Sequence, residues 1–287
     1  MHDIFYFTDV HGQLDLFQTM RDWCFRQDPE CMIVYGGDAC DRGDFGYDIM
    51  EALLDDPQIV YIKGNHEDLF VKAAEEILET YPEIANQRQT LQQAQDILEG
   101  VCFFHNVSLH IYNGGNPTLI SWLTSGTSTE FVEKIKNLPV TFSTDTIDFS
   151  HAGGTPKSFR AVSDAEYECT VPNIFAVKTM IWDRDNLHLG WIKDRILVHG
   201  HTPTCLLSPK IATVTEEECK PVAWQGLTSR EAYPGWRIDM DTGMTWTGRG
   251  YVLNCLTMEV IGFWDHDVGK VVTKRPVEEE FEKYKII

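Results

Sequence analysis

The sequence predicts an α/β fold in which parallel strands alternate with crossover helices. The segments 4–9, 31–38 and 58–67 are short and largely apolar, with β-branched and aromatic residues, as buried strands are. The segments between them, 13–27 and 45–55, carry apolar residues at helical spacing. Because parallel neighbours need a crossover of about a dozen residues, this alternation implies parallel strands joined by helices.

The rest of the chain divides into two parts. Residues 68–138 are acidic, Gln-rich and mostly helical in pattern. We interpret them as a helical insertion that covers or borders a site, with a solvated layer that never contacts substrate as the alternative. Strand patterns return at 139–153, 195–203, 236–243 and 251–264, whereas 213–226 is interpreted as a polar loop. No internal repeat or linker interrupts the chain, so we expect a single domain over residues 1–287.

Composition narrows the class of protein. With 43% hydrophobic residues among 287, the chain can bury a sizeable core and is not disordered. A formal net charge of −20 repels phosphate backbones and anionic membranes, so we expect neither nucleic acid nor membrane as a partner. No apolar stretch approaches the ~20 residues that span a bilayer, and the N-terminus lacks a signal-peptide pattern. The eight scattered cysteines contain no Cys-x-x-Cys pair, and we expect free thiols in a reducing cytoplasm.

Unusual polar groups follow each of the first three predicted strands. The first strand runs into DVHG at 9–12, the second into GGDACDRG at 36–43 and the third into GNHE at 64–67. Ligands of parallel α/β sheets bind outside the carboxyl ends of the strands, so these groups should meet at one edge. Two later strand-like segments end similarly, in SHAGG with His151 and in GHTP with His201.

These residues are weak evidence one at a time and strong evidence together. A lone aspartate or Gly-Asp pair after a strand is usually a turn or a helix cap. With each residue type at about 5%, the five fixed positions of GDxxDRG arise by chance in roughly one chain of this length in ten thousand. The histidines outside the motifs are interpreted as ordinary polar residues: His2, His105, His110, His188 and His266.

The side chains in the motifs suit two adjacent divalent cations. Carboxylate, imidazole and amide oxygen favour borderline-to-hard metals, so we expect Mn²⁺ first, with Fe or Zn as alternatives. Two such metals lie about 3.5–4 Å apart and share a carboxylate and a bridging water. Asp38 is central among the candidates and is the best bridging ligand. Asp9 and His11 would then follow the first strand because they hold a metal.

The motifs TDVHG, GDACDRG, GNHE, SHAGG and GHT span residues 8–202. In this order they resemble the signature of the calcineurin-like metallophosphoesterases, and specifically of the phosphoprotein phosphatase family. The resemblance implies a four-layer α/β/β/α sandwich of two mixed sheets with helices outside. Two departures stand out: Lys63 precedes GNHE where an arginine is common, and the eukaryotic Ser-Ala-Pro-Asn-Tyr motif is absent. The segment 240–260 resembles instead the bacterial and phage branch, which includes the symmetrical diadenosine tetraphosphatases.

The resemblance implies two metals that share Asp38. The ligands that it implies for the first metal are Asp9, His11 and Asp38. The ligands that it implies for the second metal are Asp38, Asn65, His151 and His201. His199 is a rival for the last position, but the Gly-His-Thr match favours His201.

The resemblance also implies catalytic residues. Arg42 would bind phosphate oxygens, and His66, paired with Asp41, would be the general acid. A second phosphate arginine is expected after the fourth motif. The Trp-Asp-Arg sequence that ends in Arg184 resembles the matching element of the bacterial and phage members, so Arg184 receives this role, with Arg160 as the competitor.

The expected function is that of a binuclear-metal phosphomonoesterase, most directly a serine/threonine protein phosphatase. A metal-bridging hydroxide would attack phosphorus in line, without a phosphoenzyme. The partner would be a phosphorylated protein or peptide, or a small phosphoester. The alternatives are a symmetrical dinucleoside polyphosphate hydrolase on the same scaffold and a metal-binding regulatory module. None of the six predicted ligand positions is substituted, which disfavours the regulatory module.

Overall fold

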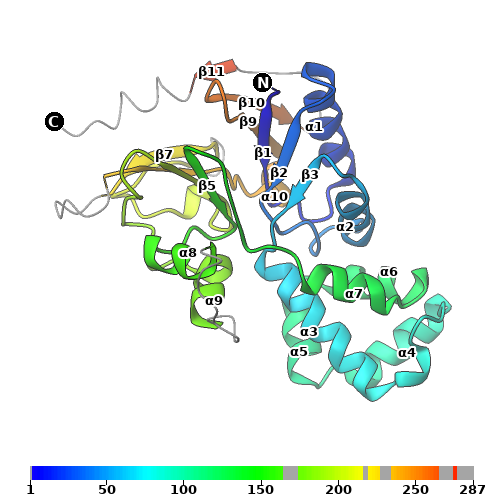
Figure 1. The fold of residues 1–287 in the computed structure, drawn as a ribbon. Coiled ribbons are helices and arrows are strands. Elements are labelled where there is room, and N and C mark those ends of the chain that lie inside the picture. The colour runs from blue at the N-terminus through cyan, green and yellow to red at the C-terminus, as the bar shows by residue number, and fades with distance from the viewer. Residues whose placement is uncertain (1, 164–173, 216–218, 227–233, 265–273, 277–287) are drawn as a thin grey trace.

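Two β-sheets pack face to face, and helices cover their outer faces (Figure 1). The computed structural model describes residues 2–163, 174–215, 219–226, 234–264 and 274–276. One sheet has six strands in the order β11-β10-β9-β1-β2-β3, and the other has five in the order β4-β5-β6-β8-β7. The arrangement is the four-layer sandwich that the sequence resemblance implies, with a group of helices attached at one end.

The six-stranded sheet contains the β-α-β-α-β pattern expected at the start of the chain. Its strands are β1 (Ile4–Phe7), β2 (Met32–Tyr35), β3 (Ile59–Tyr61), β9 (Arg249–Asn254), β10 (Glu259–Trp264) and β11 (Lys274–Pro276). The connecting helices are α1 (Leu14–Gln27) and α2 (Gly46–Asp55). β1, β2 and β3 pair in parallel, as predicted, and β9 adds to β1 in antiparallel fashion. β1, early in the chain, thus shares one sheet with β9, β10 and β11.

The five-stranded sheet is formed by later segments. Its strands are β4 (Thr141–Ser143), β5 (Ile147–Ser150), β6 (Ile196–His199), β7 (Val222–Gln225) and β8 (Trp236–Asp239). β5, β6 and β8 run parallel, and the two edge strands are antiparallel to their neighbours. The prediction of a polar loop over 213–226 was wrong for β7. Val222 and Trp224 are buried on one face of this short strand, and Ala223 is buried on the face toward the other sheet. The strand was missed because three apolar residues after a charged run are too few to show the alternation of a strand.

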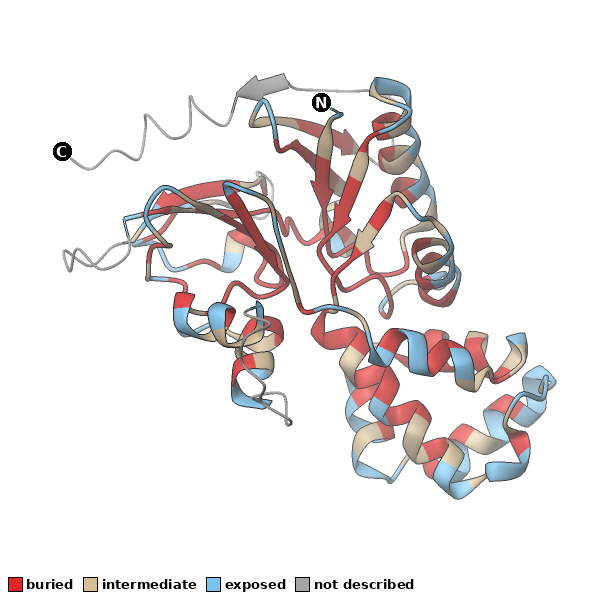
Figure 2. Ribbon diagram, viewed as in Figure 1, coloured by how far each residue is buried: buried red, intermediate tan, exposed pale blue. Residues whose placement is uncertain are grey.

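Buried residues lie along the strands of both sheets and on parts of the surrounding helices (Figure 2). The apolar ones form one cluster between the sheets and others beneath the helices. Between the sheets, Tyr6 of β1 stacks on Phe149 of β5 with ring centroids 5.5 Å apart. The outer face of the five-stranded sheet is covered by α8 (Pro156–Ser163) and α9 (Ile174–Trp182), where Phe159 packs edge-on against Trp191. Each sheet therefore packs against the other sheet on one face and against helices on the other face, which keeps the strand ends in fixed positions.

The segment predicted as a helical insertion consists of helices. They are α3 (Asn65–Thr80), a 3₁₀ turn (Pro82–Ile84), α4 (Leu91–Val101), α5 (His105–Tyr112), α6 (Asn116–Ser125) and α7 (Thr129–Lys136). Phe70 of α3 contacts Trp122 of α6 and Phe131 of α7, and this cluster continues into the core beneath α1 and α2. The insertion is therefore packed against the six-stranded half of the molecule.

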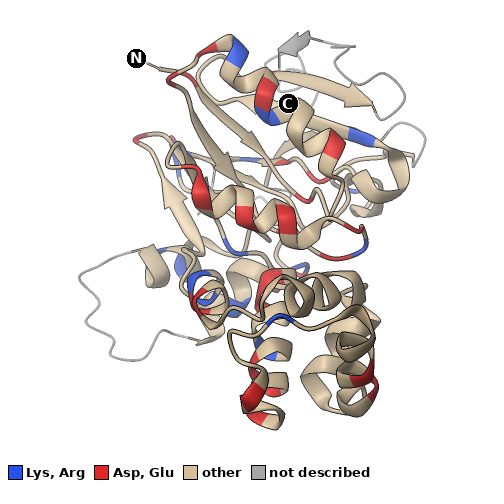
Figure 3. Cartoon of the chain, turned by 90° about the vertical axis from the view of Figure 1, so that its right-hand side faces the viewer, with Lys and Arg blue, Asp and Glu red and all other residues tan. Residues whose placement is uncertain are grey.

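Acidic residues, with basic residues between them, lie along the helices on the side of the molecule shown in Figure 3. This distribution matches a formal net charge of −20. No helix in the described part of the chain is long and apolar enough to cross a membrane.

Candidate active site

The loops after β1 and β2 run side by side at the carboxyl edge of the six-stranded sheet. The backbone N–H of Asp9 donates to the carbonyl of Gly37 over 3.0 Å, and that of His11 donates to the carbonyl of Asp38 over 3.1 Å. These bonds extend the parallel pairing beyond the strands. The polar groups that follow the strands are brought together as topology predicts.

Left-handed backbone is concentrated in these loops. Among the described residues other than glycine, ten have a positive φ, and six of them are predicted site residues: Asp9, His11, Asp38, Asp41, Arg42 and His201. Such a conformation costs about 1–3 kcal/mol per residue and persists where neighbouring bonds enforce it. The edge of the sheet is thus built to aim side chains rather than to minimise backbone energy.

Glu67, to which the sequence assigned no role, ties the loops together. Its carboxylate is fully buried and accepts hydrogen bonds from the backbone N–H groups of Asp38, Ala39 and Gly64, at 2.7–2.9 Å. The Tyr61 hydroxyl donates to it as well, over 2.8 Å. Burial, followed by the nearby Asp38 carboxylate, raises the pKa of Glu67 above its ordinary value. Its place as the last letter of GNHE was the signal that could have found it.

Two groups of possible metal ligands share Asp38. One consists of His11, Asp38 and His66, and the other of Asp38, His151 and His201, with the ligand atoms of each group within 4.8 Å of one another. All five side chains are buried. The groups come from both sheets, because His151 follows β5 and His201 follows β6. The structure therefore brings one carboxylate between two sets of imidazoles.

Backbone carbonyls orient two of these imidazoles. His11 donates from Nδ1 to the carbonyl of Cys40, and His151 donates from Nδ1 to the carbonyl of Gly36, both over 2.9 Å. Their Nε2 atoms consequently face the Asp38 carboxylate, at 3.6 Å and 3.3 Å. A histidine fixed through one nitrogen presents the other to a metal in a defined direction.

Asn65 and Asp9 lie next to the same groups. The side-chain oxygen of Asn65 is 3.0 Å from His151 Nε2. Asp9 accepts from the Thr8 hydroxyl and from the backbone N–H of His201 through Oδ2. Its Oδ1 is buried and has no hydrogen-bond partner among the described residues. An unpartnered buried carboxylate oxygen is costly unless a cation or a donor meets it.

The pKa values in the cluster indicate that its buried carboxylates are stabilised by nearby positive charge. Burial raises the pKa of Asp9 to about 6, although His151 pulls in the opposite direction. Burial alone would lower the pKa of His151, but Asp38 and Asp9 raise it to about 10. Carboxylate and amide oxygens with imidazole nitrogens, together with the unpartnered Asp9 oxygen, fit divalent metal ions.

His66, Asp41 and Arg42 form a connected group beside the first set of ligands. The Nδ1–H of His66 donates to Asp41 over 2.7 Å. The Arg42 guanidinium lies between two imidazoles, with Nη1 2.9 Å from His11 Nε2 and Nη2 3.0 Å from His66 Nε2. Burial alone would lower the pKa of His66, but Asp38 and the hydrogen bond to Asp41 raise it.

The three other basic side chains considered for phosphate binding lie in different surroundings. Arg184 donates from Nε to His201 Nε2 and from Nη2 to the His201 carbonyl, each over 3.2 Å. Arg160 is exposed on α8. The ammonium of Lys63 donates to the carbonyl of Lys136, at the end of α7. Of these three, only Arg184 has a hydrogen bond to a predicted site residue in the part of the chain that the structure describes.

The sequence missed two residues of the helical insertion. His110, interpreted above as an ordinary polar residue, donates from Nε2 to both oxygens of Asp41, at 2.8 Å and 2.9 Å. The Thr118 hydroxyl donates to Asp41 Oδ1 over 2.8 Å. The insertion therefore contacts a predicted catalytic residue. Neither residue belongs to a motif, and each is about seventy residues from Asp41 in sequence, so spacing gave no signal.

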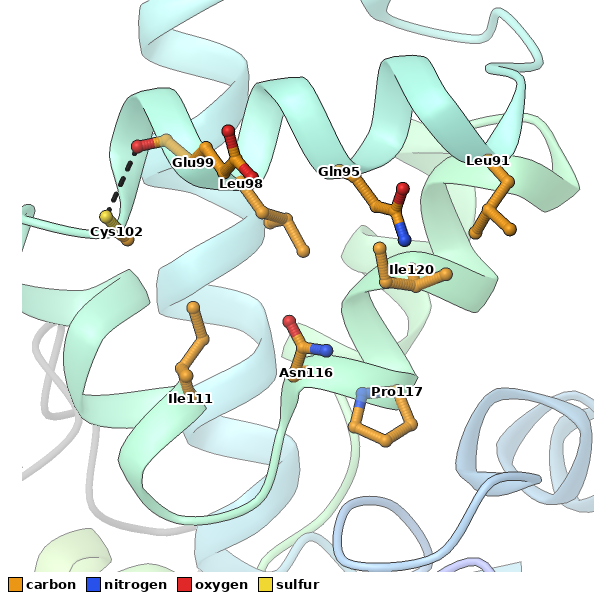
Figure 4. A pocket seen from close by; sticks show the side chains of 9 residues that line it. All are labelled: Leu91, Gln95, Leu98, Glu99, Cys102, Ile111, Asn116, Pro117 and Ile120. Carbon is orange, nitrogen blue, oxygen red and sulfur yellow. Dashed lines mark hydrogen bonds between the residues drawn. The ribbon is translucent and has the colours of Figure 1, made fainter.

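A cavity of about 600 Å³ lies elsewhere, between α4 and the facing parts of α5 and α6 (Figure 4). Leu98, Ile111 and Ile120 point into it, with Gln95 and Glu99 along its rim. Its lining includes neither of the two groups of possible metal ligands. The chemistry is therefore expected at the sheet edge and not in this cavity.

Comparison with known proteins decides the family. A sequence model described as calcineurin-like phosphoesterase matches residues 2–205, more than half of the chain. The chain belongs to the calcineurin-like phosphoesterase family. This phosphoesterase is therefore a hydrolase of phosphoesters, and its buried His/Asp groups are in keeping with divalent metals.

Solved structures agree with the fold of this phosphoesterase. A candidate diadenosine tetraphosphatase shares 14% identity at a TM-score of 0.51, over 92% of this chain and 95% of that chain. A cold-active protein tyrosine phosphatase shares 13% identity at a TM-score of 0.50, over 96% of this chain and 79% of that chain. At such identities the likeness is one of fold alone. No curated protein matches the sequence.

Proposed function

We propose that this phosphoesterase is a binuclear-metal phosphomonoesterase that acts on phosphoserine and phosphothreonine in proteins or peptides. The observation that carries the proposal is the shared position of Asp38, which has imidazoles on both sides and the His66–Asp41 pair with Arg42 beside it. Such a centre places a cation-binding core, an anion-binding arginine and a proton donor together, as phosphoester hydrolysis requires. The scattered cysteines support a reducing, cytoplasmic setting.

Two metals would share the Asp38 carboxylate. The proposed ligands of the first metal are Asp9, His11 and Asp38. The proposed ligands of the second metal are Asp38, Asn65, His151 and His201. The mixture of nitrogen and oxygen donors favours Mn²⁺, with Fe or Zn as alternatives. Bound ions would supply Lewis-acid activation of water and of the phosphoryl group.

The protein's own side chains would do the rest. Arg42 and Arg184 would bind phosphate oxygens and stabilise the charge that develops on them. His66 would donate a proton from Nε2 to the leaving oxygen, and its Nδ1–H is held by Asp41 over 2.7 Å. The buried surroundings of these groups would strengthen their electrostatic interactions with the phosphoester.

A second candidate function is symmetrical dinucleoside polyphosphate hydrolysis. It is supported by the segment 240–260, which resembles the bacterial and phage branch that includes the symmetrical diadenosine tetraphosphatases. A cavity of about 360 Å³ beside Arg184, lined also by Thr202 and Leu207, offers room for a leaving group next to the phosphate. A third candidate, a metal-binding regulatory module, is disfavoured because all six proposed ligand positions carry metal-competent side chains.

A substrate panel tests the choice. Protein stripped of metal and reloaded with single metals is assayed on a phosphothreonine peptide and on diadenosine tetraphosphate. We expect activity only after reloading, best with Mn²⁺, and a higher kcat/KM for the peptide. A tenfold preference for the dinucleotide would reverse the assignment of substrate, and activity without bound metal would overturn the binuclear proposal.

A leaving-group test examines His66. A serine or threonine phosphoester expels an alkoxide, so protonation by His66 should be worth about 10²–10⁴ in rate. An aryl phosphate expels a phenolate whose conjugate acid has a pKa near ~10 and needs less help. His66→Asn should therefore depress turnover of the phosphothreonine peptide far more than turnover of phenyl phosphate. Equal losses on both substrates would remove His66 as the acid.

A further inference from the structure

Asp41 is surrounded by more donors than a His–Asp pair needs. Its two carboxylate oxygens accept from His66 Nδ1 at 2.7 Å, from His110 Nε2 at 2.8 Å and 2.9 Å, and from the Thr118 hydroxyl at 2.8 Å. Asp41, His110 and Thr118 have no exposed surface. The group therefore forms a buried polar network, in which His110 Nδ1 has no hydrogen-bond partner among the described residues. Each bond of such a network matters more inside the protein than at the surface.

The direction of each bond follows from the chemistry of the carboxylate. The carboxylate of Asp41 meets an imidazole N–H and a hydroxyl at its two oxygens, so it is bound as the ionised form and only accepts. His110 must therefore carry its hydrogen on Nε2. The Thr118 hydroxyl donates to Oδ1 and accepts from the Asp41 backbone N–H over 3.0 Å, so Thr118 binds the side chain and the backbone together.

The turn between α5 and α6 is shaped to reach this network. A Cβ on Gly115 would lie 2.3 Å from the His110 ring, so only glycine leaves room for the imidazole. The neighbouring Gly114 has a φ of +95° and accepts the backbone N–H of Arg42 at its carbonyl over 2.9 Å. The insertion thus holds both Asp41 and Arg42, the two adjacent residues of GDACDRG that are predicted to act in catalysis.

We propose that His110 and Thr118 are positioning residues for the proton donor: together they fix the Asp41 carboxylate so that His66 Nε2 faces the scissile phosphoester. The inference rests on the proposed role of His66 as general acid. The helical insertion is then part of the catalytic machinery, because it supplies two side chains that bind Asp41.

The physical reason is the freedom of a carboxylate with one partner. If His66 alone bound it, Asp41 could rotate about its side-chain bonds, and one buried oxygen would lack a donor, which is costly. Three donors from different elements leave the carboxylate one arrangement. That arrangement directs His66 Nδ1–H toward Asp41 Oδ2 and leaves Nε2 at the position where Arg42 Nη2 lies 3.0 Å away.

Two pairs of variants test the proposal in the full-length, Mn²⁺-loaded protein. His110→Leu and Thr118→Val remove a donor, whereas His110→Gln and Thr118→Ser keep one. The donor-removing variants should lower kcat on a phosphothreonine peptide about tenfold, as lost supporting partners commonly do, and change phenyl phosphate turnover less than about twofold. The donor-keeping variants should recover most of the loss. KM should stay nearly constant, because the network acts on the proton and not on phosphate binding.

Ile111→Ala is the matched control. Ile111 follows His110 on α5 but points into the cavity between α4, α5 and α6 (Figure 4). The change loosens the insertion without removing a donor from Asp41. It should lower Tm and leave the ratio of peptide turnover to phenyl phosphate turnover unchanged. If Ile111→Ala altered this ratio as much as His110→Leu does, packing would explain the effect and the proposal would fail.

A double-mutant cycle separates this inference from the proposed function. In protein that already carries His66→Asn, His110→Leu should cause no further change in the substrate ratio, because the donor on which it acts is absent. If His66→Asn lowers peptide turnover selectively and His110→Leu and Thr118→Val do not, the positioning role is wrong while the acid remains. If His66→Asn shows no selectivity at all, the proposed acid itself is wrong.

Discussion

The two sides of Asp38 are supported in different ways. On the side of the six-stranded sheet, His11 is held by a backbone carbonyl, and His66 is held through Asp41 by the helical insertion. On the side of the five-stranded sheet, His151 is likewise held by a backbone carbonyl, but the ring of His201 is hydrogen-bonded by Arg184. Each side also contacts an arginine that is proposed to bind phosphate. Arg42 lies between two imidazoles of the first side and is itself held by the insertion, whereas Arg184 is hydrogen-bonded to His201 on the second side.

The first side is supported by the helical insertion, which binds the Asp41 side chain and the Arg42 backbone. On the second side, Arg184 binds both the ring and the backbone carbonyl of His201. The division is therefore between support from the insertion and local support from Arg184. Three predictions examine how far this division holds.

Loss of Asp38 should have the largest effect, because Asp38 serves both sides. Asp38→Asn should lower activity beyond the ~10²–10³ that a single lost transition-state donor costs, and more than Asp9→Asn does, since Asp9 would serve one metal. Metal content per chain, measured after gel filtration, should fall further in Asp38→Asn than in Asp9→Asn. Equal metal content and equal activity in the two variants would contradict the shared position of Asp38.

The arginines should show an intermediate effect and sharpen the contrast between the sides. Arg42→Ala and Arg184→Ala should each cost on the order of 10²–10³ in rate by removing phosphate stabilisation, with metal content intact. Arg160→Ala is the matched control and should be silent, since Arg160 is exposed on α8. If Arg160→Ala lowered the rate and Arg184→Ala did not, Arg160 would be the second phosphate-binding arginine. Loss of metal in Arg184→Ala alone would show that the second side depends on this cation structurally.

The parts of the molecule that sequence could predict are those governed by local pattern. The β-α-β-α-β start follows from alternating periodicities, and the meeting of Asp9, Asp38 and Asn65 follows from the rule that parallel strands end at one edge. A resemblance to family motifs then supplied the second sheet and the histidines after β5 and β6. In each case a short segment carried the information.

What sequence could not predict depends on contacts between distant segments. His110 and Thr118 reach Asp41 only because α5 and α6 fold back over the start of α3, and no spacing in a Gln-rich helical region reveals that contact. β7 was not predicted for a related reason, since its three apolar residues form a strand through pairing with β8. Long-range hydrogen bonds and edge-strand pairing are tertiary properties, which local periodicity does not encode.

The smallest effect is expected at His199, the rival of His201 on the second side. His199 is fully buried at the end of β6, where its ring packs edge-on against Trp224 and its Nε2 has no partner among the described residues. Burial, and then the nearby Arg237, lower the pKa of His199 to about 3, so it stays neutral. His201 instead lies with Asp38 and His151 in one group of possible ligands.

His199→Gln and His201→Gln therefore form a matched pair with opposite expected outcomes. His201→Gln should lose about one metal per chain and most of the activity, because it removes a ligand of the second metal. His199→Gln should keep its metal content and change kcat less than about threefold, with a loss of stability of about 0.5–3 kcal/mol, typical of a buried substitution. Metal analysis and urea unfolding measure the two quantities. If His199→Gln lost metal while His201→Gln retained it, the rival assignment would be correct and the second side would be built from the strand β6 itself.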